Sequence, residues 1–229
     1  MLNEGDHVMK KSLRIYLLFL LNSLSGCLTS TPFQSARVVE PGQQSGSISL
    51  QKSIDADEDK DYSWYMMEFS GRFPVDEGRV DFMLGGAIMA LQNDDGLSGV
   101  GGMFGLGPKF EIFQNILAIE LPARVMFAGE ATLQSTHIYP RAILSLPVAE
   151  LLEINLSHTR YYFLNETTSH PYAFAAGLAI GRRGGNIVRP EIGILVFPEG
   201  HDVLQFGIAY TPEAPARPST WENGRETPH

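Results

Sequence analysis

The sequence contains a single cysteine, Cys27, among its 229 residues. One cysteine excludes an intrachain disulfide bond and a multi-cysteine metal site. The chain also lacks an excess of basic residues, since 17 lysines and arginines stand against 26 acidic residues and the formal net charge is −9. This charge gives no electrostatic basis for binding phosphate backbones, so we expect no nucleic-acid partner.

Signatures of enzymes and metal sites are missing as well, and no nucleophile-elbow motif is present. Four histidines show no close metal-ligand spacing: His137, His158, His170 and His201. The glycines between 99 and 107 are followed by Pro108 and by no helix pattern, which argues against a phosphate loop and favours relief of crowding on a strand face. The alternating aspartates between 55 and 61 lack the glycine and the closing glutamate of an EF-hand loop. We therefore expect no catalytic residue, no metal site and no enzymatic activity.

The N-terminal region has the layout of a secretory signal. A positive leader at 10–14 precedes the apolar run 15–21, and small uncharged residues follow up to Cys27. The apolar run is too short to span a membrane as a mature helix. Met9 directly precedes two lysines and is an alternative start, which leaves the mature protein unchanged.

Four consecutive residues resemble the lipobox of bacterial lipoproteins: Leu24, Ser25, Gly26 and Cys27. The resemblance implies that diacylglycerol is attached to the cysteine and that residues 1–26 are removed as a signal peptide. Apart from this lipid we expect no cofactor. Leu28 is not the aspartate that commonly retains lipoproteins in the inner membrane, so the resemblance implies sorting to the outer membrane. The alternative interpretation is a buried free cysteine behind an N-terminal membrane anchor.

Two polar segments flank the expected folded domain, which we place at 44–211. Residues 27–43 carry Ser, Thr, Pro and Gly without periodicity, as expected for a lipidated tether. Residues 212–229 contain four prolines among polar residues and predict a disordered tail.

Between these segments, strand-like patterns alternate with turn-forming residues, and no convincing amphipathic helix is present. Ten strands are predicted, over 44–52, 62–73, 78–91, 98–112, 116–128, 136–148, 151–164, 171–182, 187–197 and 202–211. Lengths of roughly 9 to 14 residues exceed the mode of about 5 to 6 for soluble sheets and suit the roughly 9 to 11 of a tilted membrane strand. The expected fold class is all-β, an antiparallel up-and-down β-barrel of about ten strands.

One face of each clearly alternating strand is apolar. In the fifth predicted strand the apolar residues face away from Glu120 and Arg124, and in the ninth they face away from Arg189 and Glu191. A membrane barrel turns such faces to lipid. A lipid-tethered soluble lipocalin-like or β-sandwich domain, binding a small ligand in the periplasm, would instead bury them, and alternation alone does not separate these two alternatives.

The connections between strands form two sets at opposite barrel ends. One set contains 55–61, 93–96, 129–135, 165–169 and 199–201, and the other contains 74–78, 114–115, 149–150 and 182–186. The first set is longer on average and more acidic. Because outer-membrane barrels have short periplasmic turns and longer external loops, we expect the first set to be external.

The membrane-barrel interpretation makes four charged residues candidate lumen residues, because charges are costly in hydrocarbon: Glu120, Arg124, Arg189 and Glu191. We predict that Glu120 pairs with Arg124 and Arg189 with Glu191, and that side chains fill most of the lumen. The expected role is structural or narrow permeation, and a polar permeation path or ligand site is the alternative.

As a whole, the lipobox, the tether and the long amphipathic strands resemble bacterial outer-membrane β-barrel lipoproteins that have no assigned substrate. The resemblance implies a lipid-anchored location in the outer membrane. It also implies membrane lipid and the barrel and lipoprotein assembly machinery as partners, whereas a small-molecule ligand stays unknown.

Overall fold

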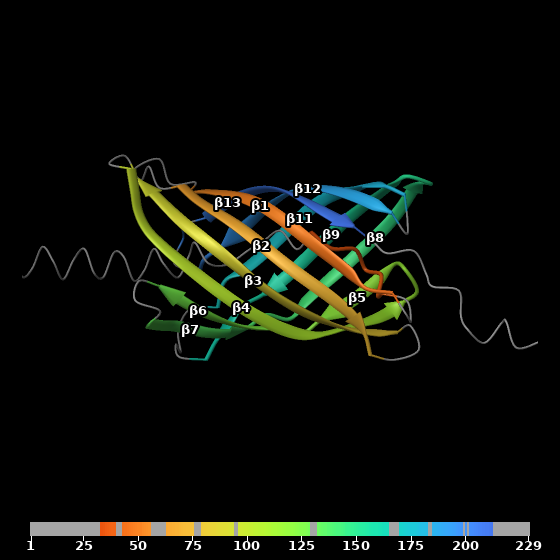
Figure 1. The fold of residues 1–229 in the computed structure, drawn as a ribbon, viewed down its shortest axis with the longest axis horizontal. Helices are drawn as coiled ribbons and strands as arrows, with labels where there is room; N and C mark the ends of the chain where they lie inside the picture. The colour runs from red at the N-terminus through yellow and green to blue at the C-terminus, as the bar shows by residue number, and fades with distance from the viewer. Residues whose placement is uncertain are drawn as a thin grey trace, which may run out of the picture.

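The computed structural model describes residues 33–39, 43–55, 63–75, 79–93, 96–128, 132–164, 170–182, 185–198, 200 and 202–212. Within these ranges the protein is all-β, and 13 strand segments form one antiparallel sheet that closes into a barrel (Figure 1). None of the described residues belongs to a helix long and apolar enough to cross a membrane. The lipobox with Cys27, part of the predicted tether and the tail 213–229 lie outside the described residues.

The described segments assemble into ten strands. Seven are continuous: β1 (Ser45–Asp55), β2 (Ser63–Pro74), β3 (Val80–Asn93), β4 (Gly96–Phe113), β11 (Tyr172–Gly181), β12 (Asn186–Val196) and β13 (Asp202–Pro212). Three are interrupted once, namely β5 (Leu117–Glu120) with β6 (Ala123–Ala128), β7 (Thr132–Ile138) with β8 (Arg141–Ala149), and β9 (Leu152–Arg160) with β10 (Tyr162–Phe163). The prediction of an all-β antiparallel barrel of about ten strands is confirmed, with strands close to the predicted ranges.

Neighbours along the chain are neighbours in the barrel wall, which is the up-and-down arrangement. β4 pairs with β3 along one side and with β6 and β5 along the other. The interrupted strands continue this order, since β6 pairs with β7 and β5 pairs with β8. β1 closes the barrel by pairing with β2 and β13, with Leu50 opposite Met67 on one side and Ile208 on the other. Closure leaves the sheet without a long free edge.

Prolines mark two of the three interruptions. Pro122 separates β5 from β6, and Pro140 separates β7 from β8. A proline has no amide hydrogen and cannot donate to the ladder. Each proline carbonyl still accepts a hydrogen bond from the neighbouring strand, with Tyr139 N 3.0 Å from Pro122 O and Arg160 N 3.0 Å from Pro140 O. The wall therefore stays paired through its carbonyls where these strands break.

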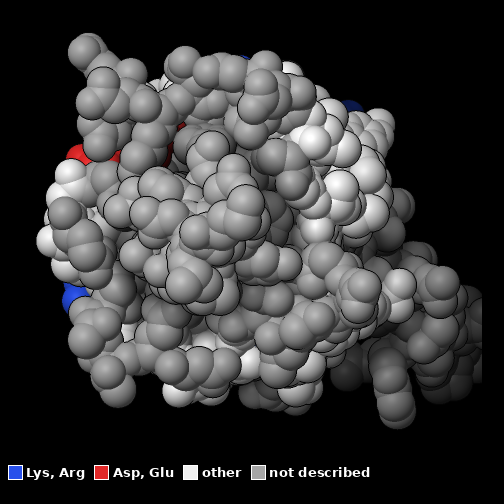
Figure 2. All heavy atoms as spheres, turned by 90° about the vertical axis from the view of Figure 1, so that its left-hand side faces the viewer, with Lys and Arg blue, Asp and Glu red and all other residues white. Residues whose placement is uncertain are grey.

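The outer surface of the barrel wall is apolar, whereas the inner surface combines polar and charged side chains with hydrophobic clusters. Leu50, Phe174 and Ile208 point outward and are 56%, 50% and 50% exposed. Gln51 and Gln205 point inward and are buried. At the barrel end seen in Figure 2, the visible described surface carries very few acidic or basic side chains. A soluble lipocalin-like cup or β-sandwich would bury its apolar faces, so the structure contradicts the soluble alternative.

The two barrel ends differ in their connections. β1 begins and β13 ends at the same end, which we call the tether end, and its connections are residues 75–79, 114–116, 150–151 and 182–185. At the opposite end, the far end, residues 56–62, 94–95, 129–131, 164–171 and 197–201 connect the strands. The far-end connections are longer on average, as the sequence predicted for an external side.

Candidate functional site in the barrel lumen

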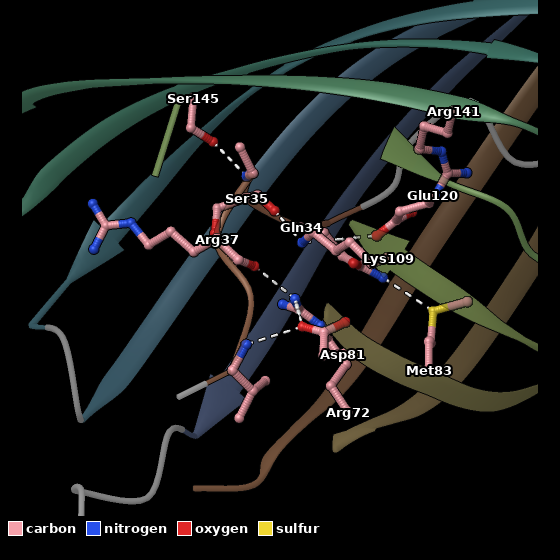
Figure 3. A network of polar contacts seen from close by, with 12 residues as sticks. Gln34, Ser35, Arg37, Arg72, Asp81, Met83, Lys109, Glu120, Arg141 and Ser145 are labelled. Atoms are coloured by element: carbon pink, nitrogen blue, oxygen red, sulfur yellow. Dashed lines mark hydrogen bonds and ion pairs between the residues drawn. The ribbon is translucent and has the colours of Figure 1, made fainter. Parts of the chain in front are cut away.

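Part of the chain occupies the lumen of its own barrel. Residues 33–39, which we call the lumen segment, run inside the wall near the tether end (Figure 3). Phe33, Ala36 and Val39 are 4%, 0% and 6% exposed. The sequence predicted a tether over these residues, and nothing in their composition indicated that they would be buried.

Phe33 lies where glycines leave room for it and for its partner Glu191. A Cβ atom on Gly207 would be 2.2 Å from Phe33 Cζ, and one on Gly177 would be 2.2 Å from Glu191 Cγ. The amide of Phe33 donates to Glu191 Oε2 at 3.0 Å. Phe33 has a φ of 49°, in the left-handed region that costs a non-glycine residue about 1–2 kcal/mol. The surrounding contacts therefore hold this residue in an unfavourable backbone conformation.

Two further amides of the lumen segment donate to the wall. Ala36 N donates to Ser145 Oγ at 2.7 Å, and Ser145 Oγ in turn donates to Asn155 Oδ1 at 2.5 Å. Val39 N donates to Asp81 Oδ2 at 2.9 Å. Ser145 and Asp81 are both completely buried, so these acceptors have no access to bulk water.

Two carbonyls of the lumen segment accept hydrogen bonds from cationic side chains of the wall. Lys109 Nζ donates to Ser35 O, and Arg72 Nη2 donates to Arg37 O at 2.6 Å. Arg72 also forms an ion pair with Asp81, so one carboxylate binds both this cation and an amide of the segment. Figure 3 shows these groups converging on the segment from several strands.

Side chains of the lumen segment make fewer polar contacts than its main chain, although Ala36 packs with Ala118 and Ile143. Gln34 Nε2 lies 3.1 Å from Met83 Sδ, a weak acceptor. Arg37 Nη2 lies 3.1 Å from Glu153 Oε2. The hydrogen bonds between the wall and the segment thus mainly involve main-chain atoms, which every non-proline residue carries.

Glu120 is shared by two buried cations. Its carboxylate lies 3.3 Å from Arg141 Nη1 and 3.8 Å from Lys109 Nζ. Arg141 Nε also donates to Thr159 Oγ1 at 2.9 Å. The three charged residues are at most 2% exposed. Buried charges of this kind are tolerated only when they are paired, so the triad holds β4, β5 and β8 in one arrangement.

Arg124 pairs with Glu68 across the lumen, not with Glu120. Arg124 Nη2 lies 2.6 Å from Glu68 Oε1, and Gly105 makes room for the side chain, because a Cβ there would be 2.5 Å from Arg124 Cγ. The predicted Glu120–Arg124 pair is therefore absent from the structure, although both residues point into the lumen. The glycine of β4 relieves crowding on the inner face, as the sequence suggested.

The second predicted pair, Arg189 with Glu191, stays a prediction. Arg189 and Glu191 both lie on the inner face of β12 and are 4% and 6% exposed. The contact described for Glu191 is with the amide of Phe33. All four candidate lumen charges are thus buried inside the barrel, while the partners of Glu120 and Arg124 come from strands that the sequence pattern did not identify.

Aromatic and methionine side chains fill the lumen beyond the charged residues. One buried cluster comprises Tyr139, Tyr161, Phe163, Ala173, Leu195, Phe197 and Val203, and another comprises Met66, Ala87, Met89, Met103 and Met126. The rings of Tyr139 and Tyr161 stack with centroids 5.6 Å apart. The guanidinium groups of Arg124 and Arg141 lie 5.0 and 5.3 Å from the centroid of Tyr139, within cation–π distance. These tyrosines lie in strand breaks, Tyr139 between β7 and β8 and Tyr161 between β9 and β10, a position that the alternation pattern does not reveal.

The cavities beside the lumen segment are small. One of about 40 Å³ is lined by Arg37, Glu153 and Arg189 among others, and one of about 10 Å³ adjoins Phe33 and Gln34. Such volumes hold one or a few water molecules. In the described part of the chain, no group of three or more His, Cys, Asp or Glu side chains is arranged to hold a metal ion.

Comparison with known proteins finds similarity at the level of the fold. No family model and no curated protein sequence matches the chain. Among solved structures, an outer-membrane channel from Pseudomonas putida F1 is similar at 7% identity and a TM-score of 0.48, covering 78% of this chain and 97% of the channel. The translocator domain of the autotransporter NalP from Neisseria meningitidis is similar at 8% identity and a TM-score of 0.44, covering 91% and 96%. The CymD monoaromatic hydrocarbon channel is similar at 8% identity and a TM-score of 0.43, covering 77% and 89%.

No residue role is transferred at these identities, and the geometry itself defines the class of protein. An even number of antiparallel strands, an apolar outer surface and charged side chains buried on the inside of the wall are the features of an outer-membrane-type β-barrel.

Proposed function

We propose that this chain is an outer-membrane lipoprotein whose barrel has a structural or narrow-permeation role. The observation that carries the proposal is the lumen segment, which is held inside the barrel by five main-chain hydrogen bonds. A lumen occupied by its own chain, with buried ion pairs and aromatic rings beside it, leaves no room for large solutes. Barrels of about eight strands are just wide enough to be filled by side chains, and open porins need roughly 16 to 18 strands.

Planar-bilayer recording of the purified protein tests the permeation part of this proposal. We expect silence or small gated events, because the lumen is filled at several levels. An open porin reconstituted under the same conditions serves as the positive control. A stable, porin-sized conductance from this protein would contradict a closed lumen.

The outer membrane is the proposed location because the apolar wall needs a hydrocarbon environment and the strands have membrane-spanning length. The proposed partners are the surrounding membrane lipid and the machinery that inserts barrels and matures lipoproteins. No catalytic role is proposed.

The lipid anchor on Cys27 is a separate part of the proposal and rests on the lipobox resemblance. Metabolic labelling with palmitate is expected to mark the wild-type protein and to be lost in Cys27→Ser, with accumulation of the unprocessed precursor. Ser25→Ala keeps a small residue before the cleavage site and should retain the label. Undiminished labelling of Cys27→Ser would exclude this residue as the attachment site.

A further inference from the structure

The wall of the lumen forms hydrogen bonds with main-chain groups of the lumen segment at a regular spacing along the segment. The amides of Phe33, Ala36 and Val39 donate to three wall acceptors, and the carbonyls of Ser35 and Arg37 accept from two wall cations. Every third amide is bound, and the segment forms neither helix nor strand. This is recognition of peptide groups, which every non-proline residue carries.

The binding groups come from five strands that are far apart in sequence. The acceptors Glu191, Ser145 and Asp81 lie on β12, β8 and β3, and the donors Lys109 and Arg72 lie on β4 and β2. Four of these five residues are at most 6% exposed. The barrel fold therefore presents a built set of donors and acceptors around a channel of peptide width.

The same groups would be costly to leave without partners. Removal of the lumen segment would deprive the buried carboxylates of Asp81 and Glu191 of amide donors, and would leave Ser145 Oγ without one of its hydrogen bonds. A buried polar group that loses its partner incurs its desolvation penalty. The empty site should therefore favour a replacement that carries amides at similar spacing.

We propose that the tether-end half of the lumen is a binding site for the main chain of a non-helical polypeptide, and that residues 33–39 are its resident ligand. Once the resident segment leaves, the site accepts another polypeptide segment in trans. Two side-chain features set the register of the bound chain, namely the space at Gly207 for an aromatic ring and Glu153 for a cation four residues later. This site depends on the lumen geometry and does not require the proposed permeation role.

A cleavable full chain provides the test. The full chain carries Cys27→Ser and a protease recognition sequence inserted between Val39 and Gln43. It is refolded in detergent, and the protease then cuts it between the lumen segment and β1. A fluorescent, acetylated peptide of residues 32–40 is added in excess, and its fluorescence anisotropy and the release of the cut segment are measured. We expect saturable binding to the cut chain and little binding to the uncut chain.

Matched peptides separate main-chain recognition from other binding. N-methylation of Ala36 and Val39 removes two amide donors and should weaken binding by roughly 30-fold or more. N-methylation of Arg37 and Val38, whose amides donate to none of the wall groups named above, is the control and should weaken it far less. Alanine at Gln34, Ser35 and Val38 should change affinity by no more than about threefold, since these side chains contribute little.

A second variant keeps the test decisive if the cut segment is slow to leave. Gly207→Ala places a Cβ atom against the ring of Phe33 and 2.9 Å from Leu50 O, and it should speed release. Gly85→Ala is the control, because its Cβ would lie 2.9 Å from Phe69 O in the wall and its nearest atoms are not in the lumen segment. Failure of the peptide to bind in both backgrounds overturns the proposal, as does equal binding of the two N-methylated peptides. Because the readout is binding and not conductance, this failure is distinguishable from failure of the proposed function.

Discussion

Replacement of Glu120 by leucine is expected to lower the free energy of unfolding by about 3–5 kcal/mol, because it leaves two buried cations without their carboxylate. Lys109 and Arg141 both contact Glu120 and are almost completely buried. Urea titration in lipid vesicles, followed by the fluorescence of Trp64 in β2, measures the change.

Removing the two cations together with the carboxylate provides the matched control. In Glu120→Leu combined with Lys109→Met and Arg141→Met, no unpaired charge remains, and most of the lost stability should return. Glu153→Gln, at a pair nearer the tether end, should cost much less than Glu120→Leu because its side chains are more exposed. A loss below about 1 kcal/mol in Glu120→Leu would contradict the assigned role of the triad.

An arginine in place of Ile208 is expected to cost about 2–4 kcal/mol in a lipid bilayer, as charges do near the midplane of a barrel wall. Ile208 points outward from the middle of β13 and is 50% exposed. The same unfolding measurement in vesicles, compared with wild type, reports the cost.

Leu151→Arg is the control for this prediction. Leu151 lies in the turn between β8 and β9 at the tether end, so an arginine there should cost only about 0–1 kcal/mol. Equal costs at the two positions, or a stable folded monomer of Ile208→Arg in buffer without detergent, would refute a lipid-facing wall.

The barrel could be predicted from the sequence because the strand pattern is local. In β5 and β6, Ile119 and Leu121 face outward while Glu120 and Arg124 face inward, and this alternation needs no knowledge of neighbouring strands. The position of each strand and the polar character of the inner surface followed from this pattern.

The partners of the lumen charges could not be predicted in the same way. Glu120 and Arg124 share a face but are four residues apart, which is about 13 Å along an extended strand. Their actual partners lie on adjacent or opposite walls, with Arg141 directly across from Glu120 in the β5–β8 pairing. Such pairs depend on register and barrel closure, which the alternation pattern leaves open.

The lumen segment was missed because its contacts are far from local in the sequence. Phe33 contacts Glu191, 158 residues away, and the segment itself has no periodicity. One indirect signal is present, since the inward-facing Gly177 and Gly207 have no side chain at the places where Glu191 and Phe33 lie.

The short connection between the lumen segment and β1 determines how strongly the segment competes for its own site. Only three residues separate Val39 from Gln43. A ligand held by so short a linker has an effective concentration on the order of millimolar at its site. A free polypeptide at micromolar concentration would therefore be outcompeted by the lumen segment of the intact chain, even if the two had equal intrinsic affinity. The lumen therefore exchanges its occupant only where the covalent link between the segment and β1 is cut.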